Sequence, residues 1–592
     1  MSTGGWRLAA GLVVVGGALA LFGPAAWSPT ELHAGTDWLD TYGTHWFYWW
    51  TQQQVLGADP GPLLFHPWGK DVYGHTGGNI LDALLAAPAR EILGATLGTN
   101  LILLGILLSN AWGGARVAAA AGLGGGAQLL GAGLLLLNPF VLQELQRGRP
   151  TQAILVFPCL VVASLLGRPT VRQALLGGVW LALSALTYWY AGMVGAALVG
   201  LAVIARWVAG GGRAELLRLG GMAVTTGALV LPFAWPMLVQ LDGGAVPGLL
   251  ALSDTPGALG RLQLETVEGD PQGLFILSLS GVGGALVDRD GLVFDAGVRL
   301  LGVAHLIGFG LGVWLCPRGL RAVGVGLTLG AAAIAVGPAL ILGDDFLANP
   351  LYLFGVERLD VLRRWWWPGR AVAWMHLGVV VLAVGGLHRA GDRFGPGLRA
   401  LAGGALLVLA AVPPVRSGVA PLDAWRAAVS PGITCLRAAP PGAVIELPYE
   451  LGQRPLYHQT IHEKPILNGM LVTKDAFLPP ELVEIRARNT ALRLLLDLGE
   501  RDWRQPRDGW TEEDLEELVG LGYRYVVFRK EGYLRPRPQR DGSTRMESDW
   551  PRARRILREV DFLGSPRWED DELALYTLGG APLECEAAAP AP

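Results

Sequence analysis

The chain has 592 residues, of which 51% are hydrophobic and only 16% are charged. Soluble proteins carry about 25% charged residues, so this composition excludes an ordinary soluble protein and indicates one that lies largely in a membrane. A formal net charge of -3, without a clustered basic surface, excludes nucleic acid as a partner. The Cys and His residues show no zinc-type spacing, so no metal ligand is predicted from motifs.

Apolar segments of membrane-spanning length recur along the chain. A spanning helix needs about 20 mostly apolar residues. The first candidate, Leu8–Trp27, is long and has no clean signal-peptide cleavage site, so we expect it to be retained as a helix. Ten further spans are expected at about Asn100–Val117, Gly122–Leu137, Ala153–Leu166, Ala174–Tyr188, Ala191–Ala205, Met222–Leu238, Leu300–Cys316, Ala322–Leu342, Ala371–Leu387 and Leu401–Val412. The pattern predicts an α-helical polytopic membrane protein with about eleven transmembrane helices.

Arginine placement predicts the orientation of these spans. With the N-terminus in the cytoplasm, every short inner connection carries Arg, as the positive-inside rule requires. The segment 28–99 then forms a long first outer loop. An odd number of spans places the chain after residue 415 outside the cytoplasm.

The composition changes abruptly after Pro413-Pro414, where charged residues become frequent. We therefore predict two domains, a transmembrane domain at 1–415 and an extracytoplasmic α/β domain at 416–592. Strands are expected at Ala443–Leu447, Tyr523–Phe528 and Glu572–Leu578, and helices at Pro480–Leu498, Thr511–Leu521 and Pro551–Phe562. Cys435 and Cys585 bracket this region, and a disulfide between them is left open.

An acidic pair followed by a run of aromatic residues comes just after the first span. Asp37 and Asp40 are spaced i,i+3, which places both carboxylates on one face if the stretch is helical. The Trp and Tyr residues that follow are typical of a membrane–water boundary. An ionised Asp can accept a proton from a bound hydroxyl, which predicts a general base. The alternative is that either Asp merely caps a helix.

Two outer segments carry Arg against the positive-inside bias. Arg147 and Arg149 lie in a tight turn that ends at Gln152, and Arg370 closes a tryptophan-rich segment before a span. Guanidinium groups bind phosphate bidentately, so these residues are candidates for an anionic ligand. The alternative role of these arginines is to anchor the chain at the membrane–water interface.

The first outer loop is also rich in histidine. Substrate binding is a hypothesis for His66 and His75, as it is for Gln152, and a divalent metal in this loop is left open because loop histidines are often merely solvated. In the C-terminal region, the polar segment Tyr457–Pro465 is interpreted as a surface loop.

The chain resembles the GT-C superfamily, the polytopic glycosyltransferases that use polyprenyl-phosphate-linked sugars. The resemblance rests on the first-loop motif Thr36–Thr41, the many spans and the closing soluble domain. More narrowly, it is similar to bacterial GT-C-like membrane proteins of unassigned substrate, through Leu64–Gly69, Asn138–Phe140 and Arg364–Arg370 and through the C-terminal segments Val444–Pro448, Gln459–Pro465 and Gly522–Phe528.

The resemblance implies an enzyme of a bacterial inner membrane. A polyprenyl-phosphate-linked donor would give its sugar to a glycan, lipid or protein acceptor at the outer face. Asp40, or else Asp37, would act as general base, and Arg147, Arg149 or Arg370 would steady the phosphate leaving group. The turn that ends at Gln152 lacks the histidine expected of the family.

The alternative is a non-catalytic membrane protein that binds or transports lipid-linked saccharides in envelope assembly. Transporters usually place ionisable residues within their spans. Here such residues crowd the outer loops, and the main exceptions are His305 and His376. This distribution favours the enzyme.

Overall fold

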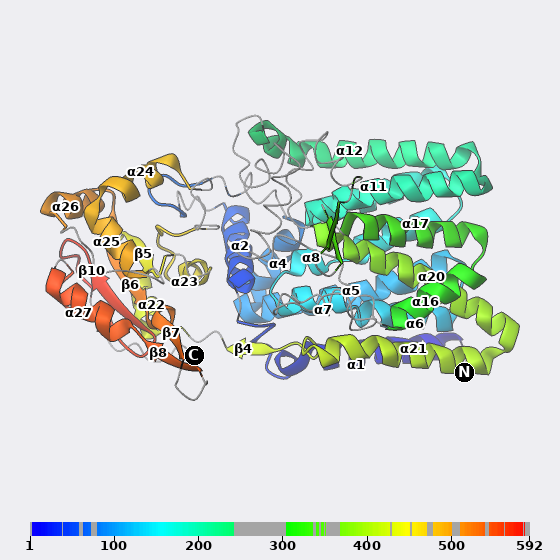
Figure 1. Ribbon diagram of the computed structural model, residues 1–592, viewed down its shortest axis with the longest axis horizontal. Coiled ribbons are helices and arrows are strands. Elements are labelled where there is room, and N and C mark those ends of the chain that lie inside the picture. The colour runs from blue at the N-terminus through cyan, green and yellow to red at the C-terminus, as the bar shows by residue number, and fades with distance from the viewer. Residues whose placement is uncertain are drawn as a thin grey trace. The chain divides into compact units, whose positions relative to one another are not determined.

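The computed structural model describes residues 3–585, apart from 38, 58–62, 71, 73–79, 242–302, 336–338, 343–344, 349, 351–367, 427–428, 450–452, 470–477, 500–509, 539–543, 562 and 584 (Figure 1). The chain divides into two compact units. A helical unit comprises Met1–Thr36 and Thr76–Trp425, and an α/β unit comprises Asp37–His75 and Arg426–Pro592. This division differs from the predicted one, because part of the first loop groups with the C-terminal region.

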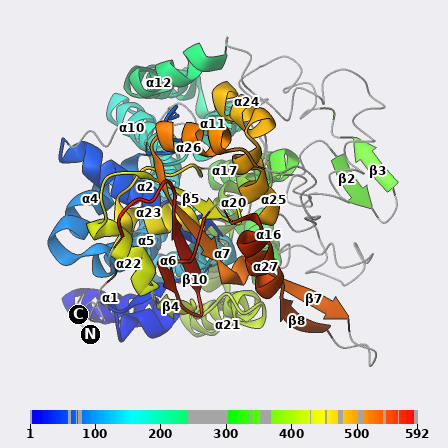
Figure 2. The same cartoon turned by 90° about the vertical axis from the view of Figure 1, so that its left-hand side faces the viewer.

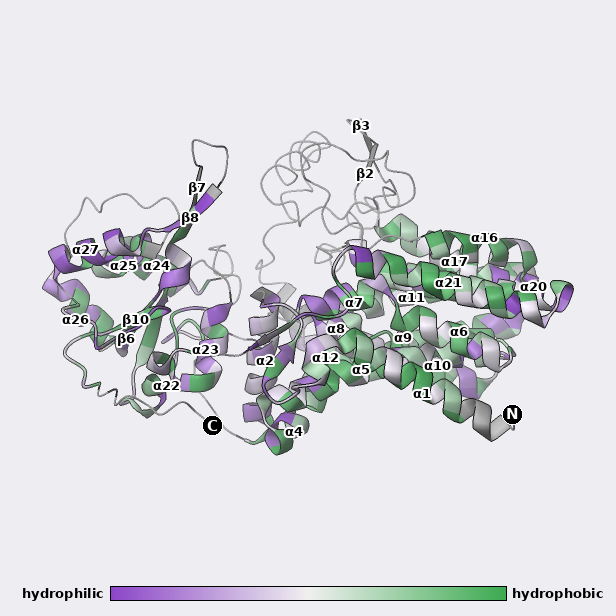
Figure 3. Cartoon of the chain, turned by 90° about the horizontal axis from the view of Figure 1, so that it is seen from below, coloured by the Kyte–Doolittle hydropathy of each residue, from purple (hydrophilic) through white to green (hydrophobic). Residues whose placement is uncertain are grey.

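The helical unit is a bundle of apolar helices. Among the described residues, eight helices are long and apolar enough to cross a membrane, and three shorter apolar helices lie at Pro150–Leu166, Val171–Thr187 and Val303–Leu315. Green hydrophobic ribbon dominates these helices in Figure 3. The helices are α1 Thr3–Phe22, α4 Leu81–Leu93, α5 Ala95–Ala120, α6 Gly125–Leu136, α7 Pro139–Gln146, α8 Pro150–Ala153, α9 Val156–Leu166, α10 Val171–Thr187, α11 Trp189–Arg206, α12 Arg213–Leu241, α16 Val303–Leu315, α17 Arg318–Ala335, α20 Val372–Phe394 and α21 Pro396–Arg416.

Helix α20 forms the centre of the bundle. In the candidate span Gly369–Phe394, 94% of an apolar 18-residue stretch is buried inside the protein, whereas the corresponding share in Pro396–Arg416 is 17%. One predicted span was too long. Helix α17 ends at Ala335, and Ala339–Leu342 instead forms strand β2, which pairs antiparallel with β3 at Asp345–Ala348.

Helices α5 and α6 approach each other closely through two glycines. A Cβ built on Gly114 would lie 2.2 Å from the backbone oxygen of Gly131. Small residues allow such backbone contact between helices in membranes.

We expect Gly114→Ala to destabilise the helical unit, because the added methyl has no room; overpacking costs about 1–3 kcal/mol. Thermal unfolding in detergent measures the effect. Gly105→Ala, on the same helix, is the matched control, because its Cβ meets nothing within 4 Å. Equal unfolding temperatures for the two variants would contradict the tight helix contact.

The α/β unit contains a four-stranded sheet in the order β5-β6-β10-β9, of which β5 and β10 are labelled in Figure 2. Strands β5 and β6 are parallel, while β10 runs antiparallel to β6 and β9. The sheet strands are β5 Ala443–Leu447, β6 Tyr523–Arg529, β9 Trp568–Glu569 and β10 Leu573–Thr577, and a separate ribbon pairs β7 Leu534–Pro538 with β8 Thr544–Ser548. The three predicted strands are confirmed, and β5 and β10 are buried along their whole length.

The three helices predicted for the α/β unit are present, one of them divided in two, and α2, α22 and α23 were not predicted. The helices of this unit are α2 Leu39–Val55, α22 Pro431–Ala438, α23 Arg454–His462, α24 Pro480–Arg488, α25 Thr490–Gly499, α26 Glu512–Gly520 and α27 Trp550–Val560. The single helix expected at Pro480–Leu498 is divided at Asn489, whose side-chain oxygen accepts the N–H of Leu492 at 2.8 Å. A side chain that satisfies the first N–H groups starts a new helix there.

Two connections bind distant parts of the α/β unit. Cys435 and Cys585 form the disulfide that the sequence left open, with their Cα atoms 5.5 Å apart. Trp46 on α2 donates its indole N–H to Gln459 Oε1 on α23 at 2.7 Å. Trp46 is 0% exposed and Tyr48 is 1% exposed, so these rings pack inside the protein and the membrane-boundary interpretation is wrong for them.

Candidate functional site

The acidic pair lies at the start of α2. Helix α2 begins at Leu39, so Asp40 is in its first turn while Asp37 precedes it. The expected arrangement of both carboxylates on one helix face is therefore wrong. Asp37 accepts a hydrogen bond from the Tyr42 hydroxyl. Desolvation raises the pKa of Asp37, the positive charge of Arg454 opposes that shift, and Glu531 adds to it.

Arg454 continues from Asp37 into a network of alternating charges. Its guanidinium lies 5.8 Å from the centre of the Tyr42 ring and forms an ion pair with Glu531. Glu531 also contacts Arg529, at 3.2 Å between Oε1 and Nη1. The carboxylate of Asp37 is thus joined electrostatically to charges that lie deep in the α/β unit.

The network ends at a buried carboxylate–imidazole pair. Arg529 Nε lies 3.0 Å from Glu446 Oε1, and the same oxygen lies 2.8 Å from His458 Nδ1. Burial alone would raise the pKa of Glu446, but His458 and Arg529 outweigh burial and hold that pKa below its ordinary value. Glu446 is therefore a buried anion held by two partners.

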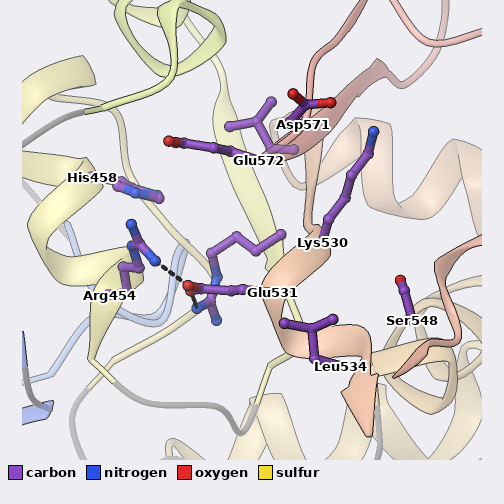
Figure 4. Close-up of a pocket in the computed structure, with 10 residues that line it drawn as sticks. Arg454, His458, Lys530, Glu531, Leu534, Ser548, Asp571 and Glu572 are labelled. Carbon is purple, nitrogen blue, oxygen red and sulfur yellow. Dashed lines mark hydrogen bonds and ion pairs between the residues drawn. The ribbon is translucent and has the colours of Figure 1, made fainter. Parts of the chain in front are cut away.

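A cavity of about 380 Å³ adjoins this network (Figure 4). Its volume lies at the lower end of the roughly 300–1,000 Å³ typical of small-ligand sites. It is lined by Arg454, His458, Arg529, Lys530, Glu531, Leu534, Ser548, Asp571, Glu572 and Leu573. All of these residues belong to the α/β unit.

In the helical unit, Arg149 is already engaged by an acid. Helix α7 begins after Asn138, whose side chain caps it, and ends at Gln146. Arg149 Nη1 lies 3.5 Å from Oε2 of Glu144, whose side chain is completely buried. Arg147 follows α7 directly, and Gln152 lies in α8 with its buried Oε1 lacking a hydrogen-bond partner among the described residues.

Arg370 is held against two tyrosine rings of the same unit. Its guanidinium lies 5.5 Å from the centre of the Tyr188 ring and 5.7 Å from that of Tyr190, and it donates a hydrogen bond to the Tyr188 hydroxyl. Glu144 lies within electrostatic range of Tyr188. The structure therefore brings Arg149 and Arg370 to one cluster around Glu144 and Tyr188. The preceding residues 351–367 lie outside the described part of the chain.

His66 holds the loop 63–69 onto the sheet of the α/β unit. Its ring Nε2 donates to the backbone oxygen of Leu521 at 3.0 Å, and its own carbonyl accepts from the Tyr523 hydroxyl. This ring nitrogen is therefore engaged within the protein. His75 lies outside the described residues. Within the described part, no group of three or more His, Cys, Asp or Glu side chains is arranged to hold a metal ion.

Sequence reasoning missed helix α23 and its buried polar side chains. The segment Tyr457–Pro465 was expected to be a surface loop, which is wrong, because helix α23 reaches His462 and buries His458, Gln459 and His462. Two signals were present in the sequence. His458 and His462 are spaced i,i+4, and a single carboxylate, Glu446, interrupts an otherwise apolar strand.

His462 makes the stability of the α/β unit depend on pH. Burial, reinforced by His458 and Lys464 and opposed by Glu446, lowers the pKa of His462 from 6.5 to about 3. The unfolded chain therefore binds the proton more tightly, so stability is full above pH 6.5 and falls as the pH drops toward 3.

We expect the unfolding temperature of wild type to fall between pH 6.5 and 5, at a cost of up to about 1.4 kcal/mol per pH unit from this residue. His462→Asn keeps an acceptor for the Lys464 N–H, which bonds to His462 Nδ1 at 3.0 Å. Calorimetry of that variant should give a flatter pH profile. An unchanged slope would show that His462 is not the titrating group.

Together, the apolar bundle and the closing α/β unit define a multi-pass membrane protein with a C-terminal α/β region. No family model and no curated protein matches the sequence. Among solved structures, the archaeal oligosaccharyltransferase AglB from Archaeoglobus fulgidus, in complex with an inhibitory peptide and a dolichol-phosphate, is similar with a TM-score of 0.53 at 11% identity, over 92% of this chain and 74% of that one. ArnT from Cupriavidus metallidurans is more distant: bound to undecaprenyl phosphate it gives a TM-score of 0.38 at 12% identity, over 99% of this chain and 100% of that one, and in the apo state 0.39 at 12% identity, over 98% of each chain. The chain shares the fold of AglB, which agrees with the fold expected from the resemblance to the GT-C superfamily.

Proposed function

We propose that the protein is a GT-C-type glycosyltransferase that moves a sugar from a polyprenyl-phosphate donor to an acceptor hydroxyl. The observation that carries this proposal is the acidic pair at the head of α2, the first long helix after the first span, in a chain that shares the fold of AglB. AglB is described in complex with a dolichol-phosphate, which supports a donor of this class.

Asp40 is assigned the role of general base. It lies in the first turn of α2, where its backbone is fixed by the helix, and its side chain is partly exposed. Asp37 has a different environment, because it accepts the Tyr42 hydroxyl and faces the charge of Arg454. We therefore assign Asp37 to positioning of the loop and Asp40 to taking the proton of the acceptor hydroxyl as that oxygen attacks the anomeric carbon.

Arg370 is assigned to the phosphate of the donor. Charge develops on this phosphate as the bond to the sugar breaks, and a fixed guanidinium stabilises it. The rings of Tyr188 and Tyr190 hold the guanidinium of Arg370 in place. Arg149 is the weaker candidate because its charge is balanced by Glu144. Arg147 is assigned to a secondary contact with the phosphate of the donor, and Gln152 to a secondary contact with the substrate.

The disulfide supports the proposed orientation. Disulfides persist in oxidising compartments, so the Cys435–Cys585 bond fits an extracytoplasmic α/β unit. With the N-terminus in the cytoplasm of a bacterial inner membrane, transfer to a glycan, lipid or protein acceptor would occur at the outer face.

Transfer from a panel of polyprenyl-phosphate sugars in proteoliposomes tests the donor assignment. We expect Arg370→Gln to lower kcat roughly 10²-fold, which is the loss typical when one hydrogen-bond donor to a developing anion is removed. Arg370→Lys should retain part of the rate. Arg389→Gln is the control, because Arg389 is exposed and is not part of the cluster around Glu144 and Tyr188. Its Nη1 lies 3.6 Å from Oδ2 of Asp392. Full activity of Arg370→Gln would contradict the assignment. Binding of lipid-linked saccharide without transfer from any donor would favour the non-catalytic alternative.

A further inference from the structure

The cavity of the α/β unit presents more hydrogen-bond acceptors than its own residues satisfy. Figure 4 shows His458 and Arg454 on one side, Asp571 and Glu572 above, and Lys530 opposite. These side chains come from α23, from the turn before β10 and from the segment after β6. Such convergence of polar groups from separate elements is typical of a built binding site.

His458 provides an oriented ring nitrogen at the wall of this cavity. It is 5% exposed, and its Nδ1 bonds to Glu446 Oε1 at 2.8 Å. Because a carboxylate only accepts, Nδ1 donates to Glu446, and Nε2 is the ring nitrogen left to form a hydrogen bond with a ligand. Nε2 has no hydrogen-bond partner among the described residues, although the ring lines the cavity.

The charges around the cavity are unevenly matched. Each of the three lining bases has an acidic partner: Arg454 pairs with Glu531, Arg529 with Glu446, and Lys530 with Glu569 at 3.1 Å. The side chains of Asp571 and Glu572 have no such partner in the described part of the chain, and both are exposed. The cavity therefore favours a ligand that donates hydrogen bonds, and it disfavours an anion.

We propose that this cavity is a carbohydrate-binding subsite that holds a neutral or amino-bearing saccharide unit of the acceptor. This inference deepens the proposed function and rests on it. Sugar hydroxyls donate to the Asp571 and Glu572 carboxylates and form a hydrogen bond with His458 Nε2, and an ammonium group binds the same two carboxylates more strongly. Leu534 and Leu573 supply an apolar wall for the C–H face of a sugar ring.

The cavity is also connected to the proposed catalytic segment through the charges already described. Arg454 lines the cavity, pairs with Glu531 and contacts the Tyr42 ring, and Tyr42 donates to Asp37. A ligand that contacts Arg454 in the cavity therefore touches the residue that holds the loop before α2. Occupancy of the subsite and the position of this loop are expected to depend on each other.

Saccharide binding to the full-length protein in nanodiscs, followed by saturation-transfer NMR, tests the subsite. The probes are three tetrasaccharides of similar size, namely cationic tetraglucosamine, neutral cellotetraose and anionic tetragalacturonate. We expect the first two to bind and the third not to bind. The double variant Asp571→Asn/Glu572→Gln should weaken tetraglucosamine binding about tenfold, which corresponds to about 1.4 kcal/mol, because both carboxylates are exposed and each contributes modestly.

The matched control is Glu513→Gln, because Glu513 is also exposed but lies on α26 and does not line the cavity. His458→Gln should weaken both cellotetraose and tetraglucosamine. Both altered acids of the double variant are at the surface, so that variant reports on binding even if His458→Gln fails to fold. Preferential binding of tetragalacturonate, or wild-type binding by the double variant, would overturn the subsite.

Kinetics separate failure of the subsite from failure of the proposed enzyme. If both hold, the double variant raises the acceptor KM with kcat unchanged, while Asp40→Asn lowers kcat and keeps saccharide binding. Transfer with an unchanged acceptor KM in the double variant would overturn the subsite and leave the enzyme intact. Saccharide binding that the double variant abolishes, in a protein that transfers from no donor, would support the subsite and contradict the enzyme.

Discussion

Replacing Asp40 by asparagine is expected to lower the rate of sugar transfer roughly 10²–10⁴-fold, the usual worth of a general base. Asparagine keeps the size and hydrogen-bonding capacity of the side chain but cannot take a proton. Because Asp40 lies inside the first turn of α2, the helix should persist in the variant. Transfer of radiolabelled sugar in proteoliposomes measures the loss, with circular dichroism to verify folding.

Asp37→Asn provides the comparison within the same segment. Asp37 accepts the Tyr42 hydroxyl, and an asparagine oxygen can accept it too, so we expect a smaller loss of kcat. A larger loss in Asp37→Asn than in Asp40→Asn would exchange the two roles. Undiminished transfer in both variants would exclude the acidic pair from the chemistry.

Replacing Glu446 by leucine should strongly destabilise the α/β unit. Glu446 is 0% exposed and pairs with His458 and Arg529, which is itself only 4% exposed. Removing one partner of a buried ion pair costs about 3–5 kcal/mol, because the remaining charge is left in the interior. For a unit of this size the unfolding temperature should fall by roughly 10 °C.

Scanning calorimetry of the full chain measures this shift, with the surface variant Glu513→Gln as the control. Glu446→Leu combined with Arg529→Met should recover part of the lost stability, since neither charge is then left alone. If Glu446→Leu unfolds at the wild-type temperature, the buried pair contributes nothing, and the account of the charge network is wrong.

The membrane part of the fold could be predicted from the sequence because hydropathy is a local property. Segments such as Ala371–Leu387 are apolar throughout, and α20 contains that segment entirely. The end of the span predicted at Ala322–Leu342 was wrong because the apolar residues of β2 have the same composition as a helix end. Periodicity cannot separate a short buried strand from a helix.

The organisation of the α/β unit could be predicted only in part. Alternating patterns and the Thr511–Asp514 capping box located strands and α26 correctly. The inclusion of α2 in this unit depends on pairs such as Trp46 and Gln459, which are 413 residues apart in the chain. A run of aromatic residues has the same composition whether it lies at a membrane or inside a protein, so no local signal separates the two.

For the candidate site, too, the sequence suggested individual residues but not their tertiary contacts. The sequence suggested Asp37, Asp40 and Arg370 as candidates because acids and arginines are conspicuous in the predicted outer loops of a membrane protein. It missed the partners that determine what each can do, because the rings of Tyr188 and Tyr190 come to Arg370 from a distant part of the chain. Contacts of this kind are a consequence of tertiary packing alone.

The most direct test of the central proposal is the coupled release of the lipid carrier. Proteoliposomes with a polyprenyl-phosphate sugar and an acceptor saccharide are analysed by mass spectrometry for free polyprenyl phosphate and for glycosylated acceptor. A glycosyltransferase of this type produces the two in equal amounts, and both disappear in Asp40→Asn. Polyprenyl phosphate without glycosylated acceptor, or neither product from any donor in a protein that still binds the lipid, would contradict the assignment.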